Sequence, residues 1–180
     1  MRAKEPQKPL LLVDVDGVIS LFAAPEGAPV GVRPVEGSFH SIDGIPHFLS
    51  STAARHLLEL ATVYDLVWAS GWEEKADEHL PYLLGLPPRL PFIRFPARVR
   101  GTRADNAHWK LQAIDAYAGP RALAWVDDAL NDACHEWAGG REAPTLLVQT
   151  SPELGLTRRE TSTLRAWARE LRTGSTAPRG

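Results

Sequence analysis

The chain has one cysteine, no long apolar run and almost no net charge, and each shortage excludes a class of protein. Cys134 alone cannot form an intrachain disulfide, which is typical of a protein in the reducing cytoplasm. No uninterrupted apolar run approaches the roughly 20 residues that a membrane-spanning helix needs. Residues 1–9 are polar and lack the apolar segment of a signal peptide. We therefore expect a cytoplasmic protein without membrane partners.

The charges nearly balance, with 20 Lys and Arg against 22 Asp and Glu, which leaves a net charge of −2. So weak an overall field does not attract nucleic acid or anionic membranes, and a nucleic-acid contact would have to come from a local patch. The 180 residues are 44% hydrophobic, which suits one soluble domain. We predict a single domain over 9–172, a flexible leader at 1–8, a flexible tail at 173–180 and no obligate protein partner.

Strand and helix patterns alternate along the chain. Strands are predicted at 10–15, 63–69, 122–126 and 145–149, and helices at 50–61, 73–84, 106–117, 129–137 and 157–171. This alternation indicates an α/β domain with a mainly parallel central sheet. Segments 30–35 and 39–42 are expected to pair as a small β-hairpin flap, with a turn near Asp43-Gly44 and another short strand at 47–49.

The most informative segment is the first predicted strand, whose apolar run ends in Asp14-Val15-Asp16-Gly17. Alternation along a strand points Asp14 and Asp16 to the same side. Two like charges so close are costly unless a cation or a shared proton compensates them. Carboxylate oxygens are the ligands that Mg²⁺ prefers, so the pair indicates a magnesium site. The alternative is an aspartate that caps a helix beside a second aspartate in a turn.

Polar residues also follow two later strands. Ser70 comes directly after the second predicted strand, and Asp127 comes directly after the third. Parallel α/β sheets bind their ligands outside the carboxyl ends of the strands. We therefore expect Asp14, Ser70 and Asp127 to lie together at one edge of the sheet.

The order of these residues resembles the four motifs of the haloacid dehalogenase (HAD) superfamily. The matching motifs are Asp14-x-Asp16, Val-Trp-Ala-Ser-Gly-Trp around Ser70, His-Trp-Lys ending at Lys110, and Ala-Trp-Val-Asp-Asp ending at Asp128. The resemblance implies a Rossmann-like three-layer α/β/α domain. Trp-Ala-Ser-Gly-Trp and His-Trp-Lys are also similar to motifs of a capless branch that occurs in RNA-repair polyproteins.

The resemblance implies a phosphoryl-transfer role for each motif. Asp14 is the expected nucleophile, which forms an aspartyl-phosphate, and Asp16 is the expected general acid and base. Dehalogenases of the superfamily typically lack an acid at the second position, so Asp16 favours phosphate chemistry. Ser70, with the backbone N–H of Gly71, would hold a phosphoryl oxygen, and Lys110 would neutralise charge there. The alternatives are a helix-capping serine and a solvated surface lysine.

The same resemblance assigns the magnesium ligands. Asp14, the backbone carbonyl of Asp16, Asp127 and Asp128 would form the site. Asp128 is favoured as a direct ligand because it begins an Asp-x-x-x-Asp pattern with Asp132, while Asp127 would bind directly or through water. Asp132 would either support the site from behind or be an exposed helix residue.

The intervals between the motifs are too short for a cap domain, so we expect an open site that suits a large substrate such as a nucleic-acid end. The flap around 22–47 would act as its lid, with Phe39, His40 and His47 either contacting substrate or serving as ordinary loop residues. Trp109 is expected in the core. Residues expected to bind substrate are Gly17, Gly71, Trp72, Arg98 and Arg100, although the basic segment 94–103 that holds both arginines also fits a solvated loop.

The sequence thus predicts a Mg²⁺-dependent phosphatase that acts through an aspartyl-phosphate on Asp14. A small-metabolite or nucleotide phosphatase of the same superfamily is the nearest alternative. A phospho-receiver domain is another alternative, but receivers carry their phosphorylated aspartate after a later strand. A binding module that has kept the fold without turnover is a third.

Overall fold

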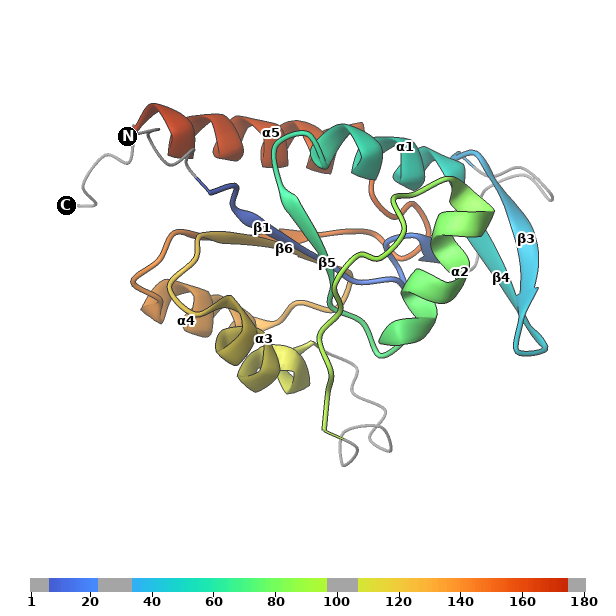
Figure 1. Cartoon of the computed structure of the whole chain (residues 1–180), viewed down its shortest axis with the longest axis horizontal. Helices are drawn as coiled ribbons and strands as arrows, with labels where there is room; N and C mark the ends of the chain where they lie inside the picture. Colours follow the sequence, from blue (N-terminus) through green and yellow to red (C-terminus); the bar gives the residue numbers. More distant parts are fainter. Residues whose placement is uncertain (1–6, 23–33, 97–106, 175–180) are drawn as a thin grey trace.

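A four-stranded parallel sheet forms the centre of the computed structural model, which describes residues 7–22, 34–96 and 107–174 (Figure 1). In spatial order its strands are β5 (Asp65–Trp68), β1 (Leu10–Val13), β6 (Leu123–Asp127) and β7 (Thr145–Gln149). β1 is central, and Val13 pairs with Trp68 on one side and Val126 on the other. All four residues of β1 are buried, as expected for a parallel strand covered on both faces.

Helices cover both faces of this sheet (Figure 1). One face carries α1 (Ser51–Leu60) and α5 (Arg158–Thr173), and the other carries α3 (Leu111–Ala118) and α4 (Asp132–Gly140). Alternate residues of β1 join separate cores: Leu11 and Val13 pack with the α1 and α5 side, whereas Leu10 and Leu12 pack with the α3 and α4 side. The predicted three-layer Rossmann-like α/β/α domain is confirmed.

Polar caps set where several helices begin. The side chain of Ser50 accepts from the N–H of Ala53 at 3.1 Å, so α1 begins where the sequence predicted. Asn131 accepts from the N–H of Cys134, so α4 begins at Asp132 and not at residue 129. Thr157 and Glu160 form a reciprocal capping box at the start of α5. Within the described ranges, no helix has the length and apolar character needed to cross a membrane.

The structure differs from the predicted helix over 106–117 in the first turn. Residues His108–Lys110 form the 3₁₀ helix η2, and α3 follows directly from it. Residue 106 lies outside the described residues. The tighter turn leaves Lys110 buried at the end of η2, facing the sheet edge where Asp14 and Asp127 lie.

A second, antiparallel sheet lies beside the carboxyl end of β1, in the order β2–β4–β3. We call it the flap; it comprises β2 (Ser20–Leu21), β3 (Gly37–Ile42) and β4 (Ile45–Ser50). The expectation that 30–35 pairs with 39–42 is wrong where it can be examined, because Pro34 and Val35 form a bend; 30–33 lie outside the described residues. β3 pairs instead with β4, since Asp43 and Gly44 have the positive φ angles that a two-residue hairpin turn requires.

The flap is held against α2 (Glu74–Leu84), which follows the end of β5. Lys75 on α2 forms an ion pair with Asp43 at the hairpin tip, which brings the two elements side by side (Figure 1). The flap is the main addition to the sheet between the first two motifs, and no cap domain occurs in the described part of the chain.

The loop after β7 supports the turn after β1. Leu156 donates its N–H to the carbonyl of Val18 at 3.0 Å, and Phe22 donates to the carbonyl of Pro152 at 3.2 Å. Gly155 is required at this contact, because its φ is +64° and a Cβ there would lie 2.3 Å from the Val18 carbonyl oxygen. The segment that follows Asp16 is therefore hydrogen-bonded to the loop after β7, the strand at the edge of the sheet.

Gly155→Ala is expected to lower the free energy of unfolding by about 2–4 kcal/mol, from left-handed strain together with the backbone clash. Gly85→Ala is the matched control, since Gly85 has φ +68° but open space around it. We expect the control to lose only about 1 kcal/mol. Urea unfolding measures both values, and equal losses would contradict close packing at Gly155.

Candidate active site

The carboxyl edge of the parallel sheet forms a cleft of about 530 Å³. The predicted catalytic and metal-binding residues line it: Asp14, Asp16, Ser70, Lys110, Asp127 and Asp128. They come from the ends of β1, β5 and β6 and from η2. The cleft lies where parallel sheets present their ligand sites, so residues far apart in sequence meet as expected.

Asp14 follows β1 and is nearly buried. Its Oδ1 accepts the N–H of Val15 at 2.8 Å, and its Oδ2 lies 2.9 Å from the Nζ of Lys110. The backbone N–H of Asp14 donates to the carbonyl of Val126 at 3.0 Å, which continues the β1–β6 ladder to this residue. The carboxylate is therefore fixed by contacts on both oxygens.

Among the described residues that line the cleft, Lys110 is the only cation, and it is only 3% exposed. Its Nζ lies 2.7 Å from Oδ2 of Asp127 as well as 2.9 Å from Asp14. Burial alone lowers the pKa of a lysine, but the two carboxylates outweigh it and raise the pKa of Lys110. The ammonium therefore stays charged between two acids.

Asp127 is fully buried, and protein donors occupy both of its oxygens. Oδ2 accepts from Lys110, and Oδ1 accepts from the N–H of Ala129 at 2.9 Å. Burial, with the charge of Asp14, raises the pKa of Asp127 although Lys110 opposes the shift. The contacts on both oxygens fix the Asp127 side chain, which can therefore hold Lys110 in place beside Asp14.

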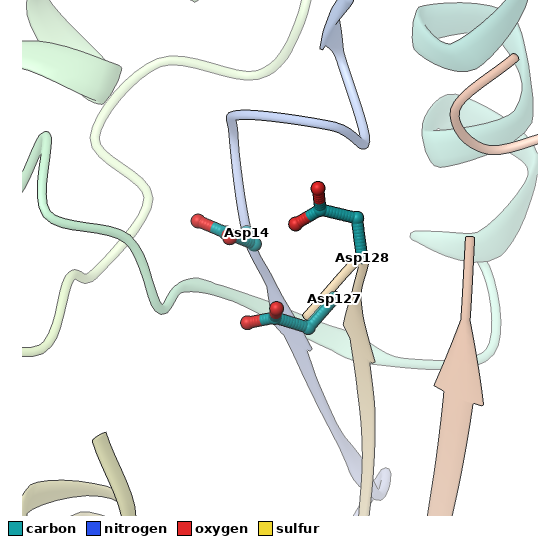
Figure 2. Close-up of side chains that lie close together, drawn as sticks. All are labelled: Asp14, Asp127 and Asp128. Carbon is teal, nitrogen blue, oxygen red and sulfur yellow. The ribbon is translucent and has the colours of Figure 1, made fainter. Parts of the chain in front are cut away.

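Asp128 is half-buried and faces Asp14 across the cleft (Figure 2). Burial and the charge of Asp14 raise the pKa of Asp128 to about 6. The ligand atoms of Asp14, Asp127 and Asp128 lie within 4.8 Å of one another. Three carboxylates around one ammonium form a strongly anionic centre, and such a set of oxygen donors suits a divalent cation.

Asp132 and Asp16 lie outside this three-acid cluster. Asp132 is an exposed residue at the start of α4, which agrees with the second of the two roles considered for it, an exposed helix residue. Asp16 is half-buried in the turn after β1, and its Oδ2 accepts the indole N–H of Trp72 at 3.0 Å. Burial and the charge of Asp14 raise the pKa of Asp16 to about 6, although the hydrogen bond from Trp72 and the charge of Lys110 oppose the shift. Its role as a ligand through the backbone carbonyl stays a prediction.

Ser70 lies two residues after the end of β5; it is buried and lines the cleft with Gly71. Ser70 does not cap α2, which begins at Glu74 after Glu73. Its Oγ instead accepts the N–H of Trp72 at 3.4 Å. A hydroxyl that accepts a hydrogen bond retains its own proton for donation, so Ser70 can still donate into the cleft.

Gly17 and Trp72, which the sequence predicted to bind substrate, are not among the residues that line the cleft, and a substrate contact by either stays a prediction. Gly17 has φ +70°, and a Cβ there would come within 2.2 Å of the carboxyl carbon of Asp128, so this glycine allows the turn to approach Asp128 closely. Trp72 is not among the residues lining the cleft, and its indole N–H is given to Asp16. His47 packs on Trp72, while His40 bonds to Ser38, and neither lines the cleft.

Two aromatic residues lie at the cleft instead. Trp109, which was expected in the core, is half-buried and packs against the core on the α3 side, and it also lines the cleft. The Nζ of Lys110 lies 5.5 Å from the centre of its ring. Phe22, which is 55% exposed, also lines the cleft. The position of Trp109 directly before Lys110 was the signal that sequence analysis could have used. Arg98 and Arg100 lie outside the described residues.

Comparison with known proteins agrees with this geometry. The family model of the HAD domain in Swiss Army Knife RNA repair proteins matches residues 10–161. The match covers most of the chain, so the chain belongs to this family and to the HAD superfamily, whose membership supports a hydrolase. The comparison with curated proteins gives no match.

We expect a divalent cation to stabilise the protein by binding the three-acid cluster. With Mg²⁺ at about a hundred times its Kd, linkage predicts a gain of about 2.7 kcal/mol in the free energy of unfolding. Asp128→Asn removes one anionic ligand and should lose most of this gain. Asp132→Asn, which changes an exposed acid on α4, should keep it. Thermal unfolding with and without Mg²⁺ measures the gain, and equal gains in both variants would remove Asp128 from the metal site.

Proposed function

We propose that this member of the family is a Mg²⁺-dependent phosphomonoesterase that forms and then hydrolyses an aspartyl-phosphate on Asp14. One observation carries the proposal: Lys110 lies 2.9 Å from Asp14 and 2.7 Å from Asp127, at the floor of a cleft that Asp16 and Asp128 also line. A buried carboxylate with a fixed ammonium beside it suits attack on an anionic phosphoryl group, which needs its charge offset as it approaches.

The donor set fits Mg²⁺. Asp14, Asp128 and the backbone carbonyl of Asp16 would hold the ion, and Asp127 would contact it directly or through water. Asp128 is favoured as a direct ligand because it is half-exposed, whereas both oxygens of Asp127 already accept from Lys110 and Ala129. When bound, the ion supplies positive charge that offsets the phosphoryl oxygens and the carboxylates.

In the first step an oxygen of Asp14 attacks the phosphorus, and the bond from phosphorus to the leaving oxygen breaks. The carboxyl group of Asp16 gives its proton to that leaving oxygen, so the alcohol departs uncharged. The N–H of Val15 and the ammonium of Lys110 hold Asp14 in place for the attack.

In the second step a water molecule attacks the phosphorus of the aspartyl-phosphate. The carboxylate of Asp16 takes the proton of that water, and the bond from phosphorus to Asp14 breaks. Phosphate leaves, and both carboxyl groups return to their starting states. Ser70 and the N–H of Gly71 would donate to phosphoryl oxygens in both steps, and Lys110 would offset their charge.

The substrate that we infer is large and carries a base near its phosphate, such as a nucleic-acid end. Three features support this inference. The described part of the chain has no cap over the cleft. Phe22 and Trp109 offer aromatic surfaces at the cleft, on which bases stack. The family is named for HAD domains of RNA repair proteins, and the sequence places Arg98 and Arg100 shortly before Lys110.

Asp14→Asn is expected to abolish phosphate release from an aryl phosphate, because an amide oxygen is too weak a nucleophile to form the phosphoenzyme. The wild-type chain should release phosphate only when Mg²⁺ is present. Colorimetric phosphate assays with Mg²⁺ or with a chelator measure both effects. Asp115→Asn, at an exposed acid on α3, is the control and should keep wild-type turnover. Full turnover in Asp14→Asn would refute the mechanism.

Charge reversal at Arg98 and Arg100 tests the nucleic-acid inference. The double change to glutamate should lower kcat/KM for an end-phosphorylated RNA oligonucleotide about tenfold or more, since phosphate contacts dominate such binding. An aryl phosphate, which has no chain to contact these residues, should be nearly unaffected. The control reverses Arg169 and Arg172, which are exposed on α5. Equal effects on both substrates would count against a nucleic-acid role for this segment.

A further inference from the structure

The carboxylate of Asp16 is held from outside the cleft by a neutral donor. We propose that Trp72 is a positioning residue, which orients Asp16 for proton transfer through its indole N–H and does not touch the substrate. This inference rests on the proposed function, in which Asp16 gives and takes a proton. It assigns to Trp72 a role different from the substrate contact that the sequence predicted.

The contact joins two loops that are distant in sequence. Asp16 lies in the turn after β1, and Trp72 lies between β5 and α2, two residues after Ser70. The distance from Nε1 of Trp72 to Oδ2 of Asp16 is 3.0 Å, which is normal for a hydrogen bond. Both side chains are half-buried, so the bond is partly shielded from water. The loop that carries Ser70 thereby also fixes the carboxylate of Asp16.

The flap holds Trp72 in this orientation. The His47 ring on β4 packs edge-on against the indole, with ring centres 4.9 Å apart and planes at 69°. Nδ1 of His47 lies 2.9 Å from Oγ of Ser20 on β2, which fixes the His47 ring within the flap. A backbone hydrogen bond also joins β2 to the turn that carries Asp16, because the N–H of Gly17 donates to the carbonyl of Ser20 at 2.8 Å. Asp16 is thus braced by two loops and the flap.

A neutral donor suits a group that changes its protonation state. An indole N–H donates but cannot accept, so it holds Oδ2 of Asp16 as an acceptor and leaves the acidic proton for Oδ1. The bond therefore persists when Asp16 is a carboxylic acid and when it is a carboxylate. A lysine or arginine here would favour the carboxylate alone. The contrast with Asp14 and Asp127 is direct, because a cation holds both of those acids and neither exchanges a proton in the mechanism.

The first test is Trp72→Phe, which removes the N–H and keeps an aromatic ring against His47. Protonation matters most for poor leaving groups, so the variant should lose about tenfold in kcat/KM for an alkyl phosphate, roughly the value of one hydrogen bond to an ionisable group. We compare kcat/KM because it reports on the steps up to departure of the alcohol, before the hydrolysis step that both substrates share. It should lose less than about threefold for a nitrophenyl phosphate, whose leaving oxygen needs little protonation. A residue that only supports the fold would lower both rates equally, and that result would overturn the proposal.

Trp137→Phe is the matched control. Its indole N–H also donates to an aspartate, Oδ1 of Asp115 at 3.1 Å, but the pair lies on α4 and α3, away from the cleft. This variant should leave the leaving-group dependence at its wild-type value. A change as large as that of Trp72→Phe would mean that loss of any such bond produces the effect, and would also overturn the proposal.

A second measurement does not depend on turnover. The indole ¹H–¹⁵N resonance of Trp72, assigned by its disappearance in Trp72→Phe, should move when Asp16→Asn replaces the acceptor, while that of Trp137 stays fixed. An unmoved Trp72 resonance would show that the contact is absent in solution. A wild-type chain that keeps the contact but releases no phosphate would overturn the proposed function, and with it the positioning role of Trp72. An absent contact in a chain that does release phosphate would overturn only the role of Trp72, so the two failures are distinguishable.

Discussion

The ammonium of Lys110, buried between Asp14 and Asp127, is the interaction on which the site depends. Its two contacts, at 2.9 and 2.7 Å, join the ends of two adjacent parallel strands to the 3₁₀ helix that begins the α3 layer. Breaking such a buried group of charges by removing one partner typically costs about 3–5 kcal/mol. The same lysine therefore aligns the strand ends, sets the orientation of Asp14 and limits the repulsion among the acids.

The acids of the cleft are held in two different ways. Where the proposed chemistry needs a permanent carboxylate, at Asp14, a charged donor is present. Where it needs a group that alternates between acid and base, at Asp16, the donor is the uncharged indole of Trp72. The flap contributes to this second arrangement through His47 and Ser20, so its position at the end of β1 has a consequence for chemistry as well as for access.

The sequence predicted the parts of the fold that depend on local pattern. The apolar run before Asp14 is a central parallel strand, and the residues that follow β1, β5 and β6 meet at one edge, because parallel topology brings carboxyl ends together. Other features depend on tertiary contacts that no local pattern contains. Trp72 and Trp109 carry similar local signals, yet one braces Asp16 and the other lines the cleft. The pairing of β3 with β4 followed from the Asp43-Gly44 turn, whose chemistry outweighed the β-branched pattern upstream.

The position of β1 at the centre of the sheet has a consequence for how the chain folds. Its hydrogen-bonding partners are residues 65–68 and 123–127, so β1 is paired on both sides only after residues 123–127 have been synthesised. Parallel pairings of such long sequence separation form slowly, because the loop-closure entropy is lost before the contacts form. Asp14 and Asp127 can meet only at this late stage, in the same event that buries Lys110 between them. The carboxyl edge of the sheet therefore cannot assemble before residues 123–127 have been synthesised.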